Sequence, residues 1–110
     1  LNEVDNLLKL NPKDEIMIVY KARIFNSLGK YDLAKVLLLQ NINRISDDDL
    51  LGHAYYVLAT SYHHLGQKDK SEELLLKSAE LNDEFGMRWL KLRMAAEFKK
   101  QIKLNKTKEI

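Results

Sequence analysis

The sequence predicts an all-α protein, an α-solenoid of antiparallel helix pairs that ends in a C-terminal capping helix. Three observations predict it. The 110 residues include one Pro and four Gly, so residues that break helices are scarce. Shifting the chain by 37 positions places Leu28-Gly29 on Leu65-Gly66, and a shift of 71 aligns a third copy. In the first two copies, the Gly follows an apolar pattern of helical period and therefore marks the end of a helix.

The composition excludes several classes of protein. Apolar residues make up 45% of the chain and charged residues 31%, which is typical of a folded domain rather than a disordered one. No Cys is present, so disulfide frameworks and Cys-based zinc sites are excluded, and a reducing, cytoplasmic compartment is expected. No apolar stretch is long enough to span a membrane. The first residue is Leu rather than Met, so the chain is expected to be part of a longer protein.

The first helix pair is predicted over residues 12–45. Asn11-Pro12 is typical of a helix start, because Pro fits the first turn, where its missing N–H is not needed. Ala22 and Phe25 continue the apolar face of this helix until Gly29 ends it, and a second helix follows over about 31–42. Residues 1–10 are expected to form the second helix of a preceding pair.

The second pair is predicted over residues 47–82. Ser46-Asp47-Asp48-Asp49 is similar to a capping box, with acids at the positive end of the helix dipole. Gly66 separates the two helices of this pair. A capping helix over 84–104 and a polar tail over 105–110 complete the chain, and residues 1–104 are expected to form a single domain.

Specific positions of the second unit carry a resemblance to a known family. Large apolar, small and aromatic residues follow one another at fixed spacing, at Tyr55, Leu58, Ala59, Tyr62, Ser71, Leu75 and Ser78. This pattern resembles the tetratricopeptide repeat (TPR), and the first unit matches it less completely. The resemblance implies a right-handed superhelix in which the first helices of successive units line a concave groove. Small residues such as Ala22, Ala34 and Ala59 are then expected where helices cross closely.

Residues with catalytic or metal-binding chemistry form no recognisable constellation. His53 and His63 lie ten positions apart on one predicted helix, about 15 Å along its axis, so they cannot share one metal ion. Acidic residues collect at helix starts, where the dipole favours them, and the four Gly do not form a phosphate-binding loop. We therefore predict no enzyme activity, no metal and no cofactor.

The function expected from the resemblance is binding of a peptide or helix of a partner protein in the groove. On a helical wheel, the residues opposite the predicted core face are expected to line this groove: Ile16, Val19, Arg23, Asn26, His53, Tyr56, Thr60, His63, Met87, Leu90 and Met94. Tyr56 is expected to contribute most to binding. An alternative is a regulatory or sensory segment of a larger signalling protein, such as a transcription regulator or a kinase.

The last helix is basic and carries two apolar stripes. Residues 88–110 hold eight Lys or Arg against two Glu, whereas residues 1–87 hold ten against fourteen acids. Few aromatic residues accompany the cations, so nucleic acid is not the expected partner. Trp89, Leu92 and Ala96 are assigned to packing on the second unit. The second stripe leads to Phe98 and Ile102, which are predicted to contact another chain, with a homodimer through this helix as one form of that contact.

Overall fold

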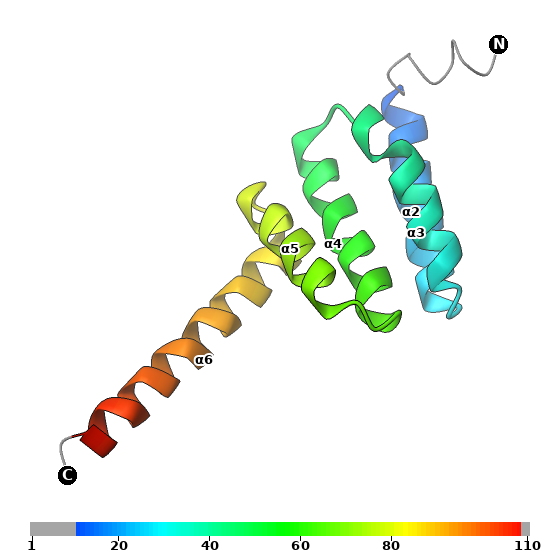
Figure 1. The fold of residues 1–110 in the computed structure, drawn as a ribbon. Helices are drawn as coiled ribbons and strands as arrows, with labels where there is room; N and C mark the ends of the chain where they lie inside the picture. The colour runs from blue at the N-terminus through cyan, green and yellow to red at the C-terminus, as the bar shows by residue number, and fades with distance from the viewer. Residues whose placement is uncertain (1–10, 109–110) are drawn as a thin grey trace.

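The computed structural model describes residues 11–108, which form helices joined by short turns (Figure 1). The predicted helix over 1–10 and the last two residues of the predicted tail lie outside the described residues. The elements are α2 (Pro12–Ser27), α3 (Tyr31–Asn41), the 3-10 turn η1 (Ile42–Arg44), α4 (Asp48–His64), α5 (Lys68–Glu80) and α6 (Glu84–Lys108). The described part contains no strand, so the all-α prediction is confirmed.

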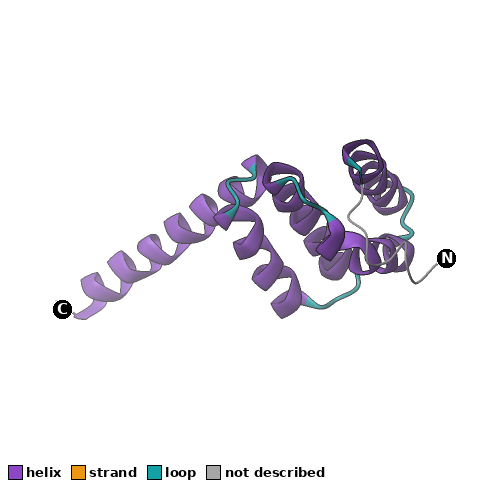
Figure 2. Ribbon diagram, turned by 90° about the horizontal axis from the view of Figure 1, so that it is seen from above, coloured by secondary structure: helices purple, strands orange, loops and turns teal. Residues whose placement is uncertain are grey.

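The helices are arranged as two neighbouring pairs followed by a single projecting helix. α2 lies beside α3, and α4 lies beside α5, with each pair joined by a tight turn (Figures 1 and 2). α4 also packs against both helices of the first pair, so the two pairs share one core. This arrangement agrees with a helical repeat in which each pair buries its apolar face against the next.

The turns inside the pairs follow from backbone conformations that the sequence permits. Gly29 and Gly66 adopt φ values of 76° and 82°, in the left-handed region that suits Gly. The amide N–H groups of Lys30 and Gln67 then donate to carbonyl oxygens five residues earlier, at 2.8 and 2.9 Å. Asn82 adopts a φ of 62° in the turn before α6 and thereby takes the same role.

The shared core depends on small residues where the helices cross. Ala22, Ala34 and Ala59 are completely buried, as the repeat pattern predicted. The buried hydroxyl of Ser71 in α5 donates to the carbonyl oxygen of Ala59 in α4, at 2.8 Å. Larger side chains fill the space around these contacts: Val19, Leu38, Ile42, Ile45, Val57, Leu58, Tyr62 and Leu74.

The connection between the pairs is part of the core, although the repeat pattern gave no indication of this. Ile42, the first residue of η1, and Ile45, which follows η1, are both buried. Glu15 of α2 is buried, and its Oε1 atom accepts from the backbone N–H and the hydroxyl of Ser46, both at 2.7 Å. The N-cap of α4 is consequently Asp47, whose carboxylate accepts from the N–H of Leu50 at 2.8 Å. Ser46 is therefore not the cap that the capping-box pattern suggested.

The final helix leaves the body of the protein after its first two turns. Gly86 is buried against Ser78 and Ala79 of α5, whereas every residue from 91 to 107 is exposed. Leu92 is 67% exposed and Ala96 is exposed, so the prediction that both pack on the second unit is wrong. The prediction required α6 to lie beside the second pair along its whole length. The helix instead diverges from that pair (Figure 1). It also continues beyond residue 104, to Lys108.

Candidate interaction groove

The first helices of the two pairs enclose a hollow with both apolar and charged walls. Between α2 and α4 it has a volume of about 250 Å³ and is lined by Ile16, Val19, Tyr20, Arg23, Leu50 and His53. A wider hollow of about 780 Å³ shares Ile16, Leu50 and His53 and reaches the start of α4, where Asp47 and Asp49 form its rim. The guanidinium of Arg23 lies over the ring of Tyr20, 5.7 Å from its centre. This contact positions the Arg23 cation at the wall that α2 contributes.

A second hollow lies between α4 and α6. Its volume is about 470 Å³, and α5 contributes part of its wall. The lining residues are Tyr56, Ala59, Thr60, His63, His64, Ser71, Leu75, Phe85, Arg88, Trp89 and Leu92. More than half of these side chains are apolar or aromatic. The basic ones are Arg88 and two histidines. α6 diverges from α4 beyond this hollow (Figure 1).

Three neighbouring rings border the two hollows. The ring centres of Tyr56 and Phe85 are 5.0 Å apart, and His53 lies 6.1 Å from Tyr56 and 5.9 Å from Phe85. His53 borders the hollow at α2, whereas Tyr56 and Phe85 border the hollow at α6. These three residues, which we call the aromatic floor, come from α4 and α6 and border both hollows.

An acidic side chain next to these rings caps the start of α6. Asp83 Oδ2 accepts from the backbone N–H groups of Phe85 and Gly86, both at 3.1 Å, and thereby caps the helix. Its Oδ1 atom lies 3.4 Å from Nδ1 of His53 in α4. The same carboxylate therefore orients the first turn of α6 and connects it to α4.

Most of the predicted groove residues of α2 and α4 border these hollows. Ile16, Val19, Arg23, His53, Tyr56, Thr60 and His63 all do so, although Val19 is only 2% exposed and presents little surface. Asn26 has a different role. Its amide donates to the carbonyl oxygen of Val57 at 3.1 Å and accepts from the hydroxyl of Ser61 at 2.8 Å. Asn26 thus connects α2 to α4.

On α6, the structure brings a different face to the hollow than the one predicted. Met87, Leu90 and Met94 do not line it; Met87 and Leu90 are half-buried, and Met94 is 63% exposed. The lining residues are Phe85, Arg88, Trp89 and Leu92. Gly86 could have indicated this orientation, because a Gly within the first turn of a helix permits close packing on that side.

Among residues 11–108, no three His, Asp or Glu side chains are grouped so that they could hold a metal ion. The ring of His64 stacks on Tyr31 at 4.4 Å and meets the ring of His63 edge-on. Within the same part of the chain, no helix combines the length and apolar character that crossing a bilayer requires.

The comparison with protein families agrees with this geometry. Residues 52–85 match the family model described as Tetratricopeptide repeat. Over these residues the chain is similar to a tetratricopeptide repeat. The matched TPR covers most of α4, all of α5 and the turn into α6, and it includes Tyr56 and Phe85. Tetratricopeptide repeats are in general protein–protein interaction modules. No curated protein and no solved structure matches the chain significantly.

Proposed function

We propose that this protein binds a peptide or helix of a partner protein in the groove formed by α2, α4 and α6, without catalysing a reaction. The observation that supports the proposal most directly is the aromatic floor of His53, Tyr56 and Phe85, which links two hollows. Aromatic side chains offer a large contact area at a small loss of conformational entropy, and they are enriched at binding hot spots.

The charged residues near the aromatic floor favour one direction of a bound peptide over the reverse direction. Asp47 and Asp49 border the wider hollow near the start of α4, Arg23 borders the smaller hollow beside it, and Arg88 borders the hollow between α4 and α6. A segment with basic residues toward the start of α4 and acidic residues toward Arg88 would be complementary to both. Apolar side chains between them would contact Tyr56 and Phe85.

A peptide-library selection tests the proposed function. Random peptides displayed on phage are selected against the full chain, and the enriched peptides are synthesised and titrated by fluorescence anisotropy. Thr60→Arg places a long cation in the hollow between α4 and α6, so we expect it to abolish binding. Leu33→Ser, on an exposed position of α3, serves as the matched control and should leave binding unchanged. Enriched peptides that bind both variants equally would contradict the groove as the binding site.

A further inference from the structure

The part of α6 beyond the groove presents an apolar stripe that nothing in the described structure covers. Met94, Phe98 and Ile102 are spaced four residues apart, so they lie on one side of the helix and span about 12 Å of its axis. They are 63%, 68% and 41% exposed, respectively. We call these three residues the α6 stripe. None of them borders the hollows described above, so the stripe is a separate surface.

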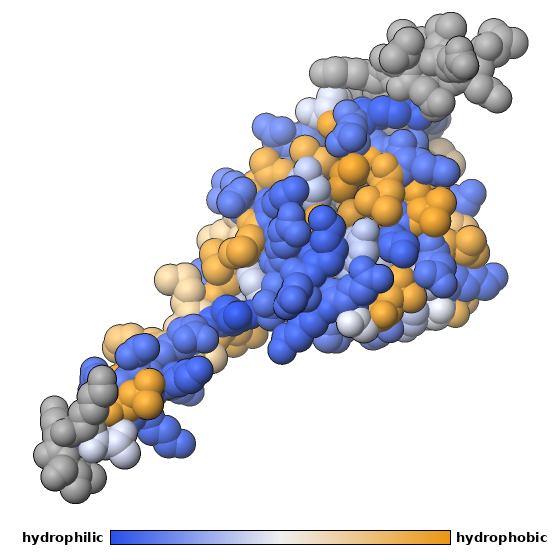
Figure 3. All heavy atoms as spheres, viewed as in Figure 1, coloured by the Kyte–Doolittle hydropathy of each residue, from blue (hydrophilic) through white to orange (hydrophobic). Residues whose placement is uncertain are grey.

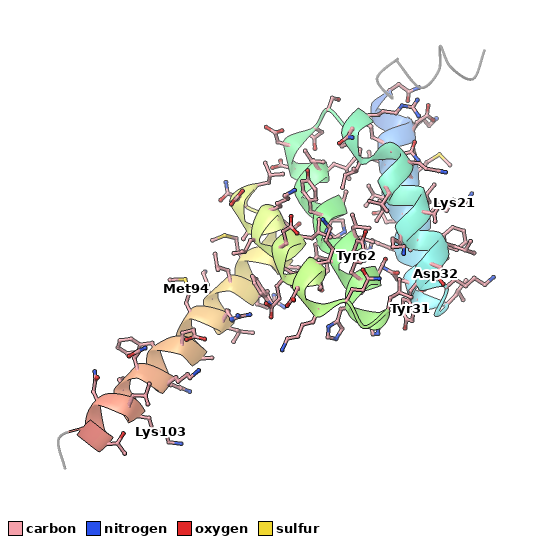
Figure 4. The ribbon with its side chains drawn as sticks, viewed as in Figure 1. Lys21, Tyr31, Asp32, Tyr62, Met94 and Lys103 are labelled. Atoms are coloured by element: carbon pink, nitrogen blue, oxygen red, sulfur yellow. The ribbon has the colours of Figure 1, made fainter. Side chains whose placement is uncertain are left out.

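The stripe lies on a strongly basic helix. Residues 91–107 contain six Lys or Arg and one Glu. Lys91, Lys99 and Lys106 each lie three or four positions from a stripe residue, as does Glu97, so three cations and one acid flank the stripe. Within residues 11–108, none of these three ammonium groups is within ion-pair distance of a carboxylate. Figure 4 shows Met94 and Lys103 projecting from opposite sides of α6, with the apolar residue on the stripe side.

The combination of a narrow apolar stripe and flanking cations restricts the kind of partner. Nucleic acid would use the cations but leave the apolar side chains without contacts. Pairing with α6 of a second copy would cover the apolar side chains but bring two basic helices together, which costs electrostatic free energy. A stripe of one residue per turn matches the seam by which one helix packs on another.

We propose that the α6 stripe binds an acidic amphipathic helix of another protein. Apolar side chains of that helix pack on Met94, Phe98 and Ile102, and Asp or Glu side chains beside its apolar seam pair with Lys91, Lys99 and Lys106. The proposal does not rest on the groove, because the two surfaces share no residue.

Two synthetic helices test this proposal against the full chain. Both contain about 20 residues with the same Leu seam, and one carries Glu beside the seam where the other carries Lys. Fluorescence anisotropy should show that the acidic peptide binds roughly tenfold or more tightly than the basic one. Its affinity should fall as salt concentration rises. Equal affinity for both peptides, or binding of neither, would overturn the proposal.

Two double variants assign the binding to the stripe. Phe98→Ser with Ile102→Ser should weaken the acidic peptide roughly tenfold or more, because the seam loses its apolar contacts. Lys99→Glu with Lys106→Glu should reverse the preference, so that the basic peptide binds more tightly. Leu33→Ser with Val36→Ser, on the exposed face of α3 that Figure 3 shows as apolar, is the control and should bind like the wild type. Unchanged binding by the two α6 variants would contradict the assignment.

The same variants distinguish the acidic helix from other molecules that could bind the α6 stripe. Sedimentation equilibrium should show a monomer at the concentrations used for titration. A dimer that the Phe98→Ser, Ile102→Ser variant abolishes would identify a second copy as the occupant and overturn the proposal. Tighter binding to duplex DNA, or to vesicles containing phosphatidylserine, than to the acidic peptide would overturn it in favour of a polyanion.

Discussion

At the scale of single residues, Asn26 shows how a polar side chain on a predicted groove face can serve the fold instead. Its two hydrogen bonds connect α2 to α4, and Ser61 on the other side is completely buried. Asn26→Ala removes both bonds and leaves buried polar groups with fewer partners. We expect a loss of about 1–2 kcal/mol in the free energy of unfolding.

Urea unfolding followed by far-UV circular dichroism measures the effect of Asn26→Ala. Asn43→Ala is the control, because Asn43 is exposed on η1, and it should change stability little. A variant as stable as the wild type but unable to bind groove peptides would show that Asn26 contacts the ligand, contrary to this interpretation.

Tyr56 is the residue that we expect to contribute most to groove binding. It is half-buried, stacks on Phe85 and borders the hollow between α4 and α6. Tyr56→Ala should weaken a selected groove peptide by about 1–3 kcal/mol, in the range of hot-spot residues. Isothermal titration calorimetry measures the affinity, and thermal unfolding of the same sample measures stability. If the variant unfolds at a much lower temperature, Tyr56 contributes to the core rather than to binding.

At the scale of helices, the contact between α5 and α6 depends on the missing side chain of Gly86. A Cβ atom there would lie 2.8 Å from the backbone nitrogen of Ala79 and would also collide with the hydroxyl of Ser78. Gly86→Ala should therefore displace α6, although Ala favours helix more than Gly by about 1 kcal/mol. Overpacking of this kind costs about 1–3 kcal/mol, so the variant should be less stable than the wild type.

The single Trp of the chain reports on this contact. Trp89 is half-buried one turn after Gly86, so displacement of α6 should shift its fluorescence emission to longer wavelength. Ala95→Gly, on the exposed part of α6, tests helix propensity alone and should leave the emission unchanged. A Gly86→Ala variant with wild-type emission and higher stability would show that the helices do not approach as closely as described.

The helix pairs could be predicted from the sequence because the signals are local and repeated. Gly29 and Gly66 occupy equivalent turns, and Ala22 and Ala59 occupy equivalent crossings, so each copy supports the other. The direction of α6 could not be predicted in this way. It depends on Asp83, which caps the helix and contacts α4, and on how closely Gly86 approaches α5. For the same reason most of the residues predicted on α2 and α4 border the hollows, whereas those predicted on α6 do not.

At the scale of the whole molecule, α6 accounts for much of the elongated shape. Its 25 residues extend about 37 Å at a rise of 1.5 Å per residue, against a longest dimension of 70 Å. In a helical repeat, stability is roughly the sum of contributions from units and from contacts between neighbours. Apart from the ion pair of Arg93 with Glu72, no hydrogen bond or ion pair joins residues 91–107 to another described helix, so the part of α6 beyond Arg93 should contribute little to the stability of the body.

Two truncations test how the stability is divided. A chain that ends at residue 94 keeps Gly86, Trp89 and the ion pair of Arg93 with Glu72, so its free energy of unfolding should fall by about 1 kcal/mol or less. A chain that ends at residue 82 lacks all of α6 and exposes Tyr56 and the α5 surface to water, so it should lose several kcal/mol, on the order of 25 cal/mol for each Å² of apolar surface exposed. Differential scanning calorimetry of both truncations and the wild type measures these differences. If the chain ending at residue 94 loses as much stability as the shorter one, the distal half of α6 packs on the protein in solution, and the stripe is not free to bind a partner helix.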